Sequence, residues 1–184
     1  MILWRLVPWR ARAKPTEPWG GLWFPRELQG AGRHDNPDRY GCLYAAQSPL
    51  SVVAEALAPF RGSGALTSSM LLRGGRPLAL VRLALDDGGA DGLVDLDDAR
   101  VLVRQRLRPS EVAIGARAVT QAYAARIFQR RSRALGLRWW STLEASLINV
   151  TLYDRARGHL SLLDVEPLTL EHPATLQAGE LLGL

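Results

Sequence analysis

A short apolar segment that runs directly into a capped helix sets the strongest constraint on the fold of this chain. Residues 41–46 are apolar and end in a polar turn, a pattern that predicts a β-strand. Ser48 is a favoured N-cap residue and Pro49 suits the first helical position, so a helix through Leu57 is predicted next. The sequence therefore predicts a strand-to-helix turn at which side chains from both elements meet.

Three side chains are expected to converge at this turn. Glu55 lies among the apolar positions of the predicted helix, where amphipathic patterning gives a charge no structural task. Tyr44 lies on the strand just before the helix, and Arg33 follows a glycine shortly upstream. We expect the three to line one pocket. The alternative for each is structural: Glu55 as a helix-surface carboxylate, Arg33 as its ion-pair partner and Tyr44 as a core residue.

Strands and helices follow one another along the chain without regular alternation. Strands are predicted at residues 2–7, 41–46, 77–85, 137–140, 149–153 and 160–170. Helices are predicted at residues 49–57, from a cap at Asp97 or Asp98 through Leu107, at residues 117–135 with a stop at Gly136, and at residues 173–182. This order favours an α+β fold with a mixed, split β-sheet and flanking helices over a doubly wound fold. With 184 residues and no internal repeat or linker, a single domain spanning residues 1–184 is expected.

Two loops stand out by their composition. Residues 10–32 are rich in proline, glycine and aromatic residues, and long loops of this kind are often functional. Their aromatic side chains either stack on a planar ligand or pack the loop against the domain, and packing is the preferred interpretation. The acidic, glycine-rich residues 86–98 lack the ligand spacing of a calcium loop and are interpreted as a solvated turn.

The charge balance and the cysteine content restrict the class of protein. The net charge is +5 with a pI near 10.1, and Lys14 is the only lysine, so the positive charge is almost all arginine. Guanidinium groups suit oxyanion binding, although genome composition explains the same bias. A single cysteine, Cys42, excludes an intrachain disulfide and a cysteine-based zinc site. With no recognisable signal peptide and no apolar span of membrane length, a cytoplasmic protein without membrane segments is expected.

Several familiar chemistries are excluded because their motifs are absent. The chain has no P-loop, no nucleophile elbow and no glycine-rich dinucleotide motif after a strand. His34, His159 and His172 lack metal-ligand spacing, so no metal site is expected. The arginines from Arg126 to Arg133 form a basic helix end, but no DNA- or RNA-binding module accompanies them. Direct nucleic-acid binding is therefore not expected.

A set of short motifs occurs along the chain in a fixed order. They are Arg5, Gly32-Arg33, the LYAA sequence at residues 43–46, Ala54-Glu55 and Trp140-Ser141. In this order, and with this spacing between Tyr44 and Glu55, they resemble the RES-domain family, which is named for an arginine, a glutamate and a serine. The resemblance extends from Ile2 to about Tyr153.

This resemblance implies a fold, an activity and a set of alternatives. Members of the family are typically toxins of bacterial toxin–antitoxin pairs. Characterised relatives destroy NAD, several of them as NAD phosphorylases, on a fold similar to ADP-ribosyltransferases. The chain is thus expected to be an enzyme that cleaves the nicotinamide–ribose bond of NAD, with inorganic phosphate as acceptor and no bound cofactor. The alternatives are an ADP-ribosyltransferase that modifies a protein and a non-catalytic, arginine-rich nucleic-acid-binding module.

The resemblance also assigns roles to individual residues. The expected catalytic residues are Glu55, Arg33 and Ser141, with Ser141 as a positioning hydroxyl rather than a nucleophile; a strand-end hydroxyl is the alternative. The residues expected to bind NAD are Arg5, Arg33, Tyr44 and Asn149. For Arg5 the alternative is a strand-end arginine that faces solvent. Two departures from the family pattern affect the substrate pose: His34 replaces a tryptophan that many members have, and Arg138-Trp139-Trp140 replaces a more usual arginine-tyrosine pattern.

The expected partner follows from the same resemblance. An enzyme that consumes NAD without control would harm its own cell, so a neutralising antitoxin with an Xre-like helix-turn-helix domain is expected. We expect the site to open between the aromatic loop from Trp9 to Phe24 and residues 33–55. An anionic segment of the partner would suit the arginines of such a cleft and block the entry of NAD.

Overall fold

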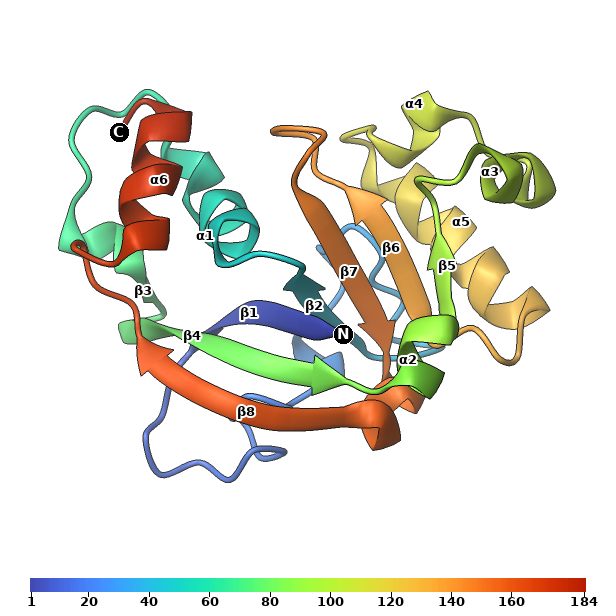
Figure 1. Cartoon of the computed structure of the whole chain (residues 1–184), viewed down its shortest axis with the longest axis horizontal. Helices are drawn as coiled ribbons and strands as arrows, with labels where there is room; N and C mark the ends of the chain where they lie inside the picture. The colour runs from blue at the N-terminus through green and yellow to red at the C-terminus, as the bar shows by residue number, and fades with distance from the viewer.

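Eight strands form one mixed sheet, and the helices are arranged around it (Figure 1). The computed structural model describes all 184 residues. The strands are β1 (Ile2–Pro8), β2 (Cys42–Ala46), β3 (Leu72–Arg73), β4 (Arg76–Leu85), β5 (Leu93–Asp95), β6 (Gly136–Trp140), β7 (Ile148–Tyr153) and β8 (Leu160–Pro167). Their order is β3-β4-β1-β2-β7-β6-β5, and β8 also pairs with β4. All pairs are antiparallel except that of β5 with β6.

The sheet is nearly divided in two between β1 and β2. Only Trp4 and Ala46 pair across this boundary, whereas β1 pairs with β4 along its whole length. The helices α1 (Pro49–Leu57) and α6 (Pro173–Leu182) lie over the half that contains β1 and β4, and α3 (Ala99–Gln105), α4 (Pro109–Val112) and α5 (Arg117–Arg130) lie beside the other half (Figure 1). The prediction of an α+β fold with a mixed, split sheet and flanking helices is confirmed.

Helices α1 and α6 begin at the residues that local sequence signals predict. The Ser48 side chain accepts a hydrogen bond from the backbone N–H of Ser51 at 3.1 Å, which caps α1. Helix α6 begins at Pro173 and ends at Leu182, and the following residue, Gly183, adopts the left-handed conformation typical of a helix C-terminus. No helix in the structure combines the length and the apolar character needed to cross a membrane.

Different parts of the chain cover the two faces of the β1–β4 half. On one face, Leu6 packs on a core formed with α1 and α6, which includes Leu57 and Leu182. On the other face, Leu3 packs with Phe24, which belongs to the long loop between β1 and β2. The aromatic loop therefore packs against the sheet on the face opposite α1.

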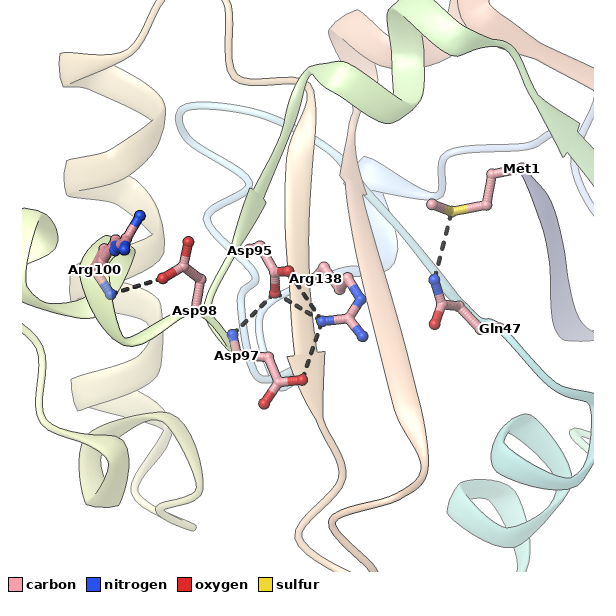
Figure 2. Close-up of polar contacts among 7 residues, drawn as sticks. All are labelled: Met1, Gln47, Asp95, Asp97, Asp98, Arg100 and Arg138. Atoms are coloured by element: carbon pink, nitrogen blue, oxygen red, sulfur yellow. Dashed lines mark hydrogen bonds and ion pairs between the residues drawn. The ribbon is translucent and has the colours of Figure 1, made fainter.

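The acidic residues 86–98 are not the solvated turn that was predicted, because they contain the short helix α2 (Asp87–Asp91) and the strand β5. Strand β5 runs parallel to β6, with Asp95 opposite Arg138. Figure 2 shows the Arg138 side chain between Asp95 and Asp97; its Nη1 lies 2.8 Å from Asp95 Oδ1 and 3.2 Å from Asp97 Oδ2. Asp98, one of the two residues predicted as a helix cap, caps α3: its side chain accepts a hydrogen bond from the backbone N–H of Arg100 at 2.7 Å. Three of these aspartates thus stabilise regular structure.

Helix α5 ends at Arg130, short of the predicted end at residue 135, and Gly136 is not its stop. Gly136 begins β6 instead, and a Cβ atom at this position would collide with the backbone oxygen of Thr151 on β7. The guanidinium of Arg155 donates to three backbone oxygens between residues 128 and 132, and so satisfies carbonyls that the helix end leaves free. The helix therefore stops early, and the chain turns into the strand.

Candidate functional site

Glu55 lies on α1, and two residues from the far half of the sheet hold its carboxylate. Ser141 Oγ, directly after β6, donates to Glu55 Oε1 at 2.7 Å, and Asn149 Nδ2, on β7, donates to the same oxygen at 2.9 Å. Both donors are buried, with only 2% and 4% of their surface exposed. No protein group donates to Oε2. The carboxylate is therefore fixed through one oxygen and open through the other.

The two donors are themselves oriented by further hydrogen bonds. Ser51 Oγ donates to Asn149 Oδ1 at 2.9 Å, which turns the amide nitrogen toward Glu55. The backbone N–H of Leu143 donates to Ser141 Oγ at 3.0 Å, so the hydroxyl proton of Ser141 is directed at the carboxylate. This buried serine is arranged to position Glu55 rather than to attack a substrate.

A pocket of about 360 Å³ opens beside Glu55, between α1 and α5. Residues of β1, β2, β6 and β7 form its floor, and α1, the first residue of α5 and residues 32 and 33 form its walls. Of the expected site residues, Arg33, Tyr44, Glu55 and Asn149 line the pocket, and Ser141 is bonded to Glu55 behind it. A pocket of this size accommodates a small-molecule ligand. No three His, Cys, Asp or Glu side chains are grouped closely enough in the structure to hold a metal ion.

Backbone oxygens, rather than a carboxylate, hold Arg33 at the pocket. Its Nη1 donates to the backbone oxygens of Val112 at 3.0 Å and Ile114 at 2.8 Å. Its guanidinium also lies 4.9 Å from the ring centre of Trp139, a favourable cation–π distance. No ion pair joins Arg33 to Glu55, so the structural alternative for the two residues does not hold. The Nε and Nη2 atoms of Arg33 have no protein partner and remain available to a ligand.

Tyr44 is tied to the loop before β2 through Asp35, a residue to which no role was assigned. The Tyr44 hydroxyl donates to Asp35 Oδ1 at 2.6 Å, while Asp35 Oδ2 accepts from the backbone N–H groups of Gly30 and Gly32 at 2.9 and 2.6 Å. A Cβ atom at Gly32 would lie 2.6 Å from both the tyrosine hydroxyl and the carboxylate, so this position requires glycine. Burial raises the pKa of Tyr44 well above its usual value, so the hydroxyl remains a donor. Tyr44 thus helps to shape the loop that carries Arg33.

His34 is completely buried behind Arg33 in a group of polar contacts. Its Nδ1 lies 2.8 Å from Thr151 Oγ1 and its Nε2 lies 2.8 Å from Tyr123 Oη, while Trp139 Nε1 donates to the same threonine oxygen at 3.1 Å. Burial, together with the positive charges of two nearby arginines, holds the pKa of His34 well below its usual range. The ring is therefore neutral at pH 7 and links α5, β6 and β7 behind the pocket.

Arg5 is the one expected site residue that the structure does not bring to the pocket. Its neighbour Leu6 lines the pocket, and side chains alternate across a strand, so Arg5 points to the opposite face. There its Nη1 donates to the backbone oxygens of Gly21 at 3.1 Å and Trp23 at 2.9 Å. The side chain is buried rather than facing solvent, and burial lowers its pKa to about 10. Arg5 therefore anchors the aromatic loop instead of contacting a ligand in this pocket.

The position of the opening also differs from the prediction. None of the residues from Trp9 to Phe24 lines the pocket, because the loop that carries them packs on the other face of the sheet. The prediction that the site opens between this loop and residues 33–55 is therefore wrong. The pocket opens instead between α1 and α5.

Two lining residues, Trp139 and Arg117, were not indicated as site residues by the sequence patterns. Trp139 lies two positions before Ser141, and strand alternation places such residues on one face, so its position was open to prediction. Arg117 is the first residue of a helix with several other arginines, and nothing in the sequence distinguishes it from them. Its place in the site follows only from the packing of α5.

The comparison with family models decides the class of protein. The RES domain model matches residues 3–172, which is nearly the whole chain. The chain belongs to the RES domain family. No curated protein matches it in sequence.

The fold of this RES domain is shared with a protein from a toxin–antitoxin complex. A chain in the crystal structure of the M. tuberculosis MbcT–MbcA toxin–antitoxin complex matches it with a TM-score of 0.66 and 16% sequence identity. The match covers 100% of this chain and 89% of that chain. At this identity the likeness establishes the fold, and the predicted α+β architecture is confirmed, which is consistent with the expected ADP-ribosyltransferase-like fold.

Proposed function

We propose that this RES domain is an enzyme that consumes NAD by cleaving the bond between nicotinamide and ribose, with inorganic phosphate as the acceptor. The observation that carries the proposal is the Glu55 carboxylate of the pocket lining, which Ser141 and Asn149 hold through one oxygen and whose other oxygen has no protein donor. A carboxylate fixed in this way can accept hydrogen bonds from ribose hydroxyls and stabilise positive charge on the sugar. Membership of the RES family supports the same activity.

The proposed reaction makes modest demands on the protein. Nicotinamide leaves with both electrons of the C1–N bond, and because its ring then becomes neutral, no strong general acid is required. Positive charge spreads over C1 and the ring oxygen of the ribose, next to Glu55 Oε2. A phosphate oxygen then forms the new bond to C1, which gives ADP-ribose 1″-phosphate and free nicotinamide. The open edge of the Arg33 guanidinium would hold phosphoryl oxygens for this step.

A toxin of a two-component system is the biological role that fits this activity. Support comes from the family and from the likeness to a chain of the MbcT–MbcA toxin–antitoxin complex. The proposed partner is an antitoxin with an Xre-like helix-turn-helix domain, and the proposed place of action is the cytoplasm. The opening between α1 and α5 is the surface that such a partner has to cover to keep NAD out.

Product analysis tests the proposed activity. Purified protein is incubated with NAD, with and without inorganic phosphate, and the products are separated and identified by mass spectrometry. We expect nicotinamide and ADP-ribose 1″-phosphate, and we expect the loss of NAD to depend on phosphate. Free ADP-ribose formed equally fast without phosphate would identify water as the acceptor, and ADP-ribosylated protein would identify a transferase. Intact NAD under all conditions would refute the enzyme proposal.

A further inference from the structure

Arg117 is a second arginine that lines the pocket, in addition to Arg33. As the first residue of α5 it lies on the wall formed by that helix, whereas Glu55 lies on the wall formed by α1. Its side chain is exposed and makes neither an ion pair nor a hydrogen bond with a protein group. Arg33, in contrast, is only 7% exposed and uses only Nη1 for its contacts with backbone oxygens. The pocket therefore presents two guanidinium groups whose donors are not all used by the protein.

The two positively charged side chains line the same pocket, and neither forms an ion pair. Glu55 is the only acidic residue that lines the pocket, and neither arginine forms an ion pair with it. Burial is the main cause of the lowered pKa of Arg33, and the charge of Arg117 lowers it further, while Tyr123, Glu55 and Tyr44 act in the opposite direction. Like charges in a partly buried site repel each other, so an anion placed between them is favoured.

The position of Arg117 on its helix works against the stability of the free protein. The N-terminus of a helix carries the positive end of the helix dipole, so a cation there is unfavourable. The first turn of α5 has no acidic residue, and its N-cap, Ala116, makes no side-chain capping bond. A cation at an uncapped helix N-terminus is unfavourable for stability, and unfavourable placements of this kind are expected at functional sites.

We infer that Arg33 and Arg117 together clamp a phosphoryl group in this pocket. Arg33 offers its Nε and Nη2 atoms from a fixed position, and Arg117 reaches the same group from the start of α5. Because Glu55 lies on α1 and Arg117 on α5, the clamp sets the direction of the substrate: the bond to be cleaved lies at α1 and the phosphoryl group at α5. The inference rests on the proposed function, since the phosphoryl group belongs either to the pyrophosphate of NAD or to the acceptor phosphate.

Ligand binding to a protein without turnover tests the clamp. In a Glu55→Gln background, ADP-ribose and inorganic phosphate are titrated separately by calorimetry. Arg117→Ala should weaken the clamped ligand about tenfold or more, because a charge-assisted contact is lost. Arg130→Ala removes the same charge from the other end of α5 and should change affinity by less than about twofold.

The two ligands separate the possible sources of the phosphoryl group. A loss confined to ADP-ribose places the pyrophosphate in the clamp, and a loss confined to inorganic phosphate places the acceptor there. Equal affinities in Arg117→Ala and its parent overturn the inference, as does a parent that binds neither ligand.

Thermal denaturation distinguishes an arginine that binds a ligand from one that only stabilises the fold. Without ligand, Arg117→Ala should melt at or above the temperature of the parent, because an unfavourable cation has been removed, while the rise in Tm caused by the ligand should shrink. A lower Tm without ligand, combined with an unchanged rise with ligand, would overturn the clamp. Neither readout needs turnover, so a protein that binds ADP-ribose through Arg117 but leaves NAD intact would refute the proposed function and keep the clamp.

Discussion

Glu55 receives both of its hydrogen bonds on one oxygen, and this asymmetry determines which atom can meet a substrate. Ser141 and Asn149 hold Oε1, whereas no protein group donates to Oε2, so this oxygen of a pocket-lining residue keeps its acceptor capacity unused. Hydrogen bonds to a charged acceptor contribute about 1.5–3 kcal/mol each, enough to keep the carboxylate in one orientation. At the scale of single residues, the site is therefore a charge held in place before a substrate arrives.

We expect Glu55→Gln to abolish the loss of NAD while the protein still folds. The amide keeps the shape of the side chain but cannot stabilise a developing positive charge. NAD turnover and a circular-dichroism melting curve are the measurements. Glu180→Gln, an exposed glutamate on α6, is the matched control and should retain the activity. Wild-type turnover by well-folded Glu55→Gln would remove the proposed mechanism.

Arg33→Lys tests whether the several donor nitrogens of the guanidinium are needed, since lysine keeps only the charge. The arginine serves two backbone oxygens through Nη1 and still presents two further nitrogens, which a single ammonium group cannot do. In the Glu55→Gln background, we expect the affinity for ADP-ribose to fall about tenfold while the protein remains folded. Calorimetric titration measures the effect, and an unchanged affinity would mean that Arg33 has only a structural role.

At the scale of elements, His34 joins three of them behind the pocket. Trp139 on β6 donates to the Thr151 hydroxyl on β7, which leaves the threonine proton free to reach Nδ1 of the imidazole. Nε2–H can then donate to Tyr123 on α5. A neutral ring satisfies every partner, whereas a charged ring brings a second donor to the Thr151 oxygen and a third positive charge next to Arg33.

This network predicts a loss of stability in mild acid. The pKa of His34 is depressed in the folded protein, where Arg33, Arg117 and Tyr123 are the titratable groups that face it, and is about 6.5 in the unfolded chain. Below about pH 6.5 the unfolded chain therefore binds a proton that the folded protein does not. The free energy of unfolding falls as the pH drops, with a slope that approaches about 1.4 kcal/mol per pH unit.

Urea denaturation at a series of pH values measures this slope. His34→Gln keeps an amide donor and acceptor but cannot titrate, so its slope should be flatter than that of the wild type, whatever its overall stability. Identical slopes in the wild type and His34→Gln would contradict the role of His34.

The elements that depend on local signals could be predicted from the sequence. The Ser48 cap and the prolines at positions 49 and 173 set the starts of α1 and α6 because capping acts within one turn. Strand β5 was missed because the residue that stabilises its aspartates, Arg138, lies 43 positions away from Asp95 along the chain. Local composition, which is acidic and rich in glycine, indicates a turn there instead.

The site was predicted in part for a similar reason. The pattern of strand β1 predicts that Arg5 and Leu6 point to opposite faces, and it does so correctly. Which of the two faces carries the pocket depends on how β1, β2 and β7 pair, and no short motif contains this information. Glu55 and Ser141 are 86 positions apart in the chain, so no local pattern predicts their contact. Only the family resemblance, which rests on the order of the motifs, placed both residues in one site.

At the scale of the whole molecule, the pocket lies where the sheet is nearly divided. Glu55 comes from α1 over one half, while Ser141, Asn149 and Arg117 belong to the other half. A single residue pair joins β1 to β2, so the hydrogen bonds to Glu55 also connect α1 to strands β6 and β7 of the other half. The pocket is lined by residues of both α1 and α5, and no residue of the aromatic loop, which packs on the far face of the sheet, lines it.

This geometry determines how the proposed antitoxin has to act. A partner that blocks the entry of NAD must reach the opening between α1 and α5, where an anionic segment would meet Arg33 and Arg117. We expect the complex with the protein encoded beside this chain to lose NAD turnover, and ADP-ribose at high concentration to weaken the complex. Arg117→Ala should weaken the complex more than Arg130→Ala does. If the complex cleaves NAD at the rate of the free enzyme, occlusion is ruled out. If the isolated chain binds DNA at moderate salt through Arg126 to Arg133 and leaves NAD intact, nucleic-acid binding is favoured instead.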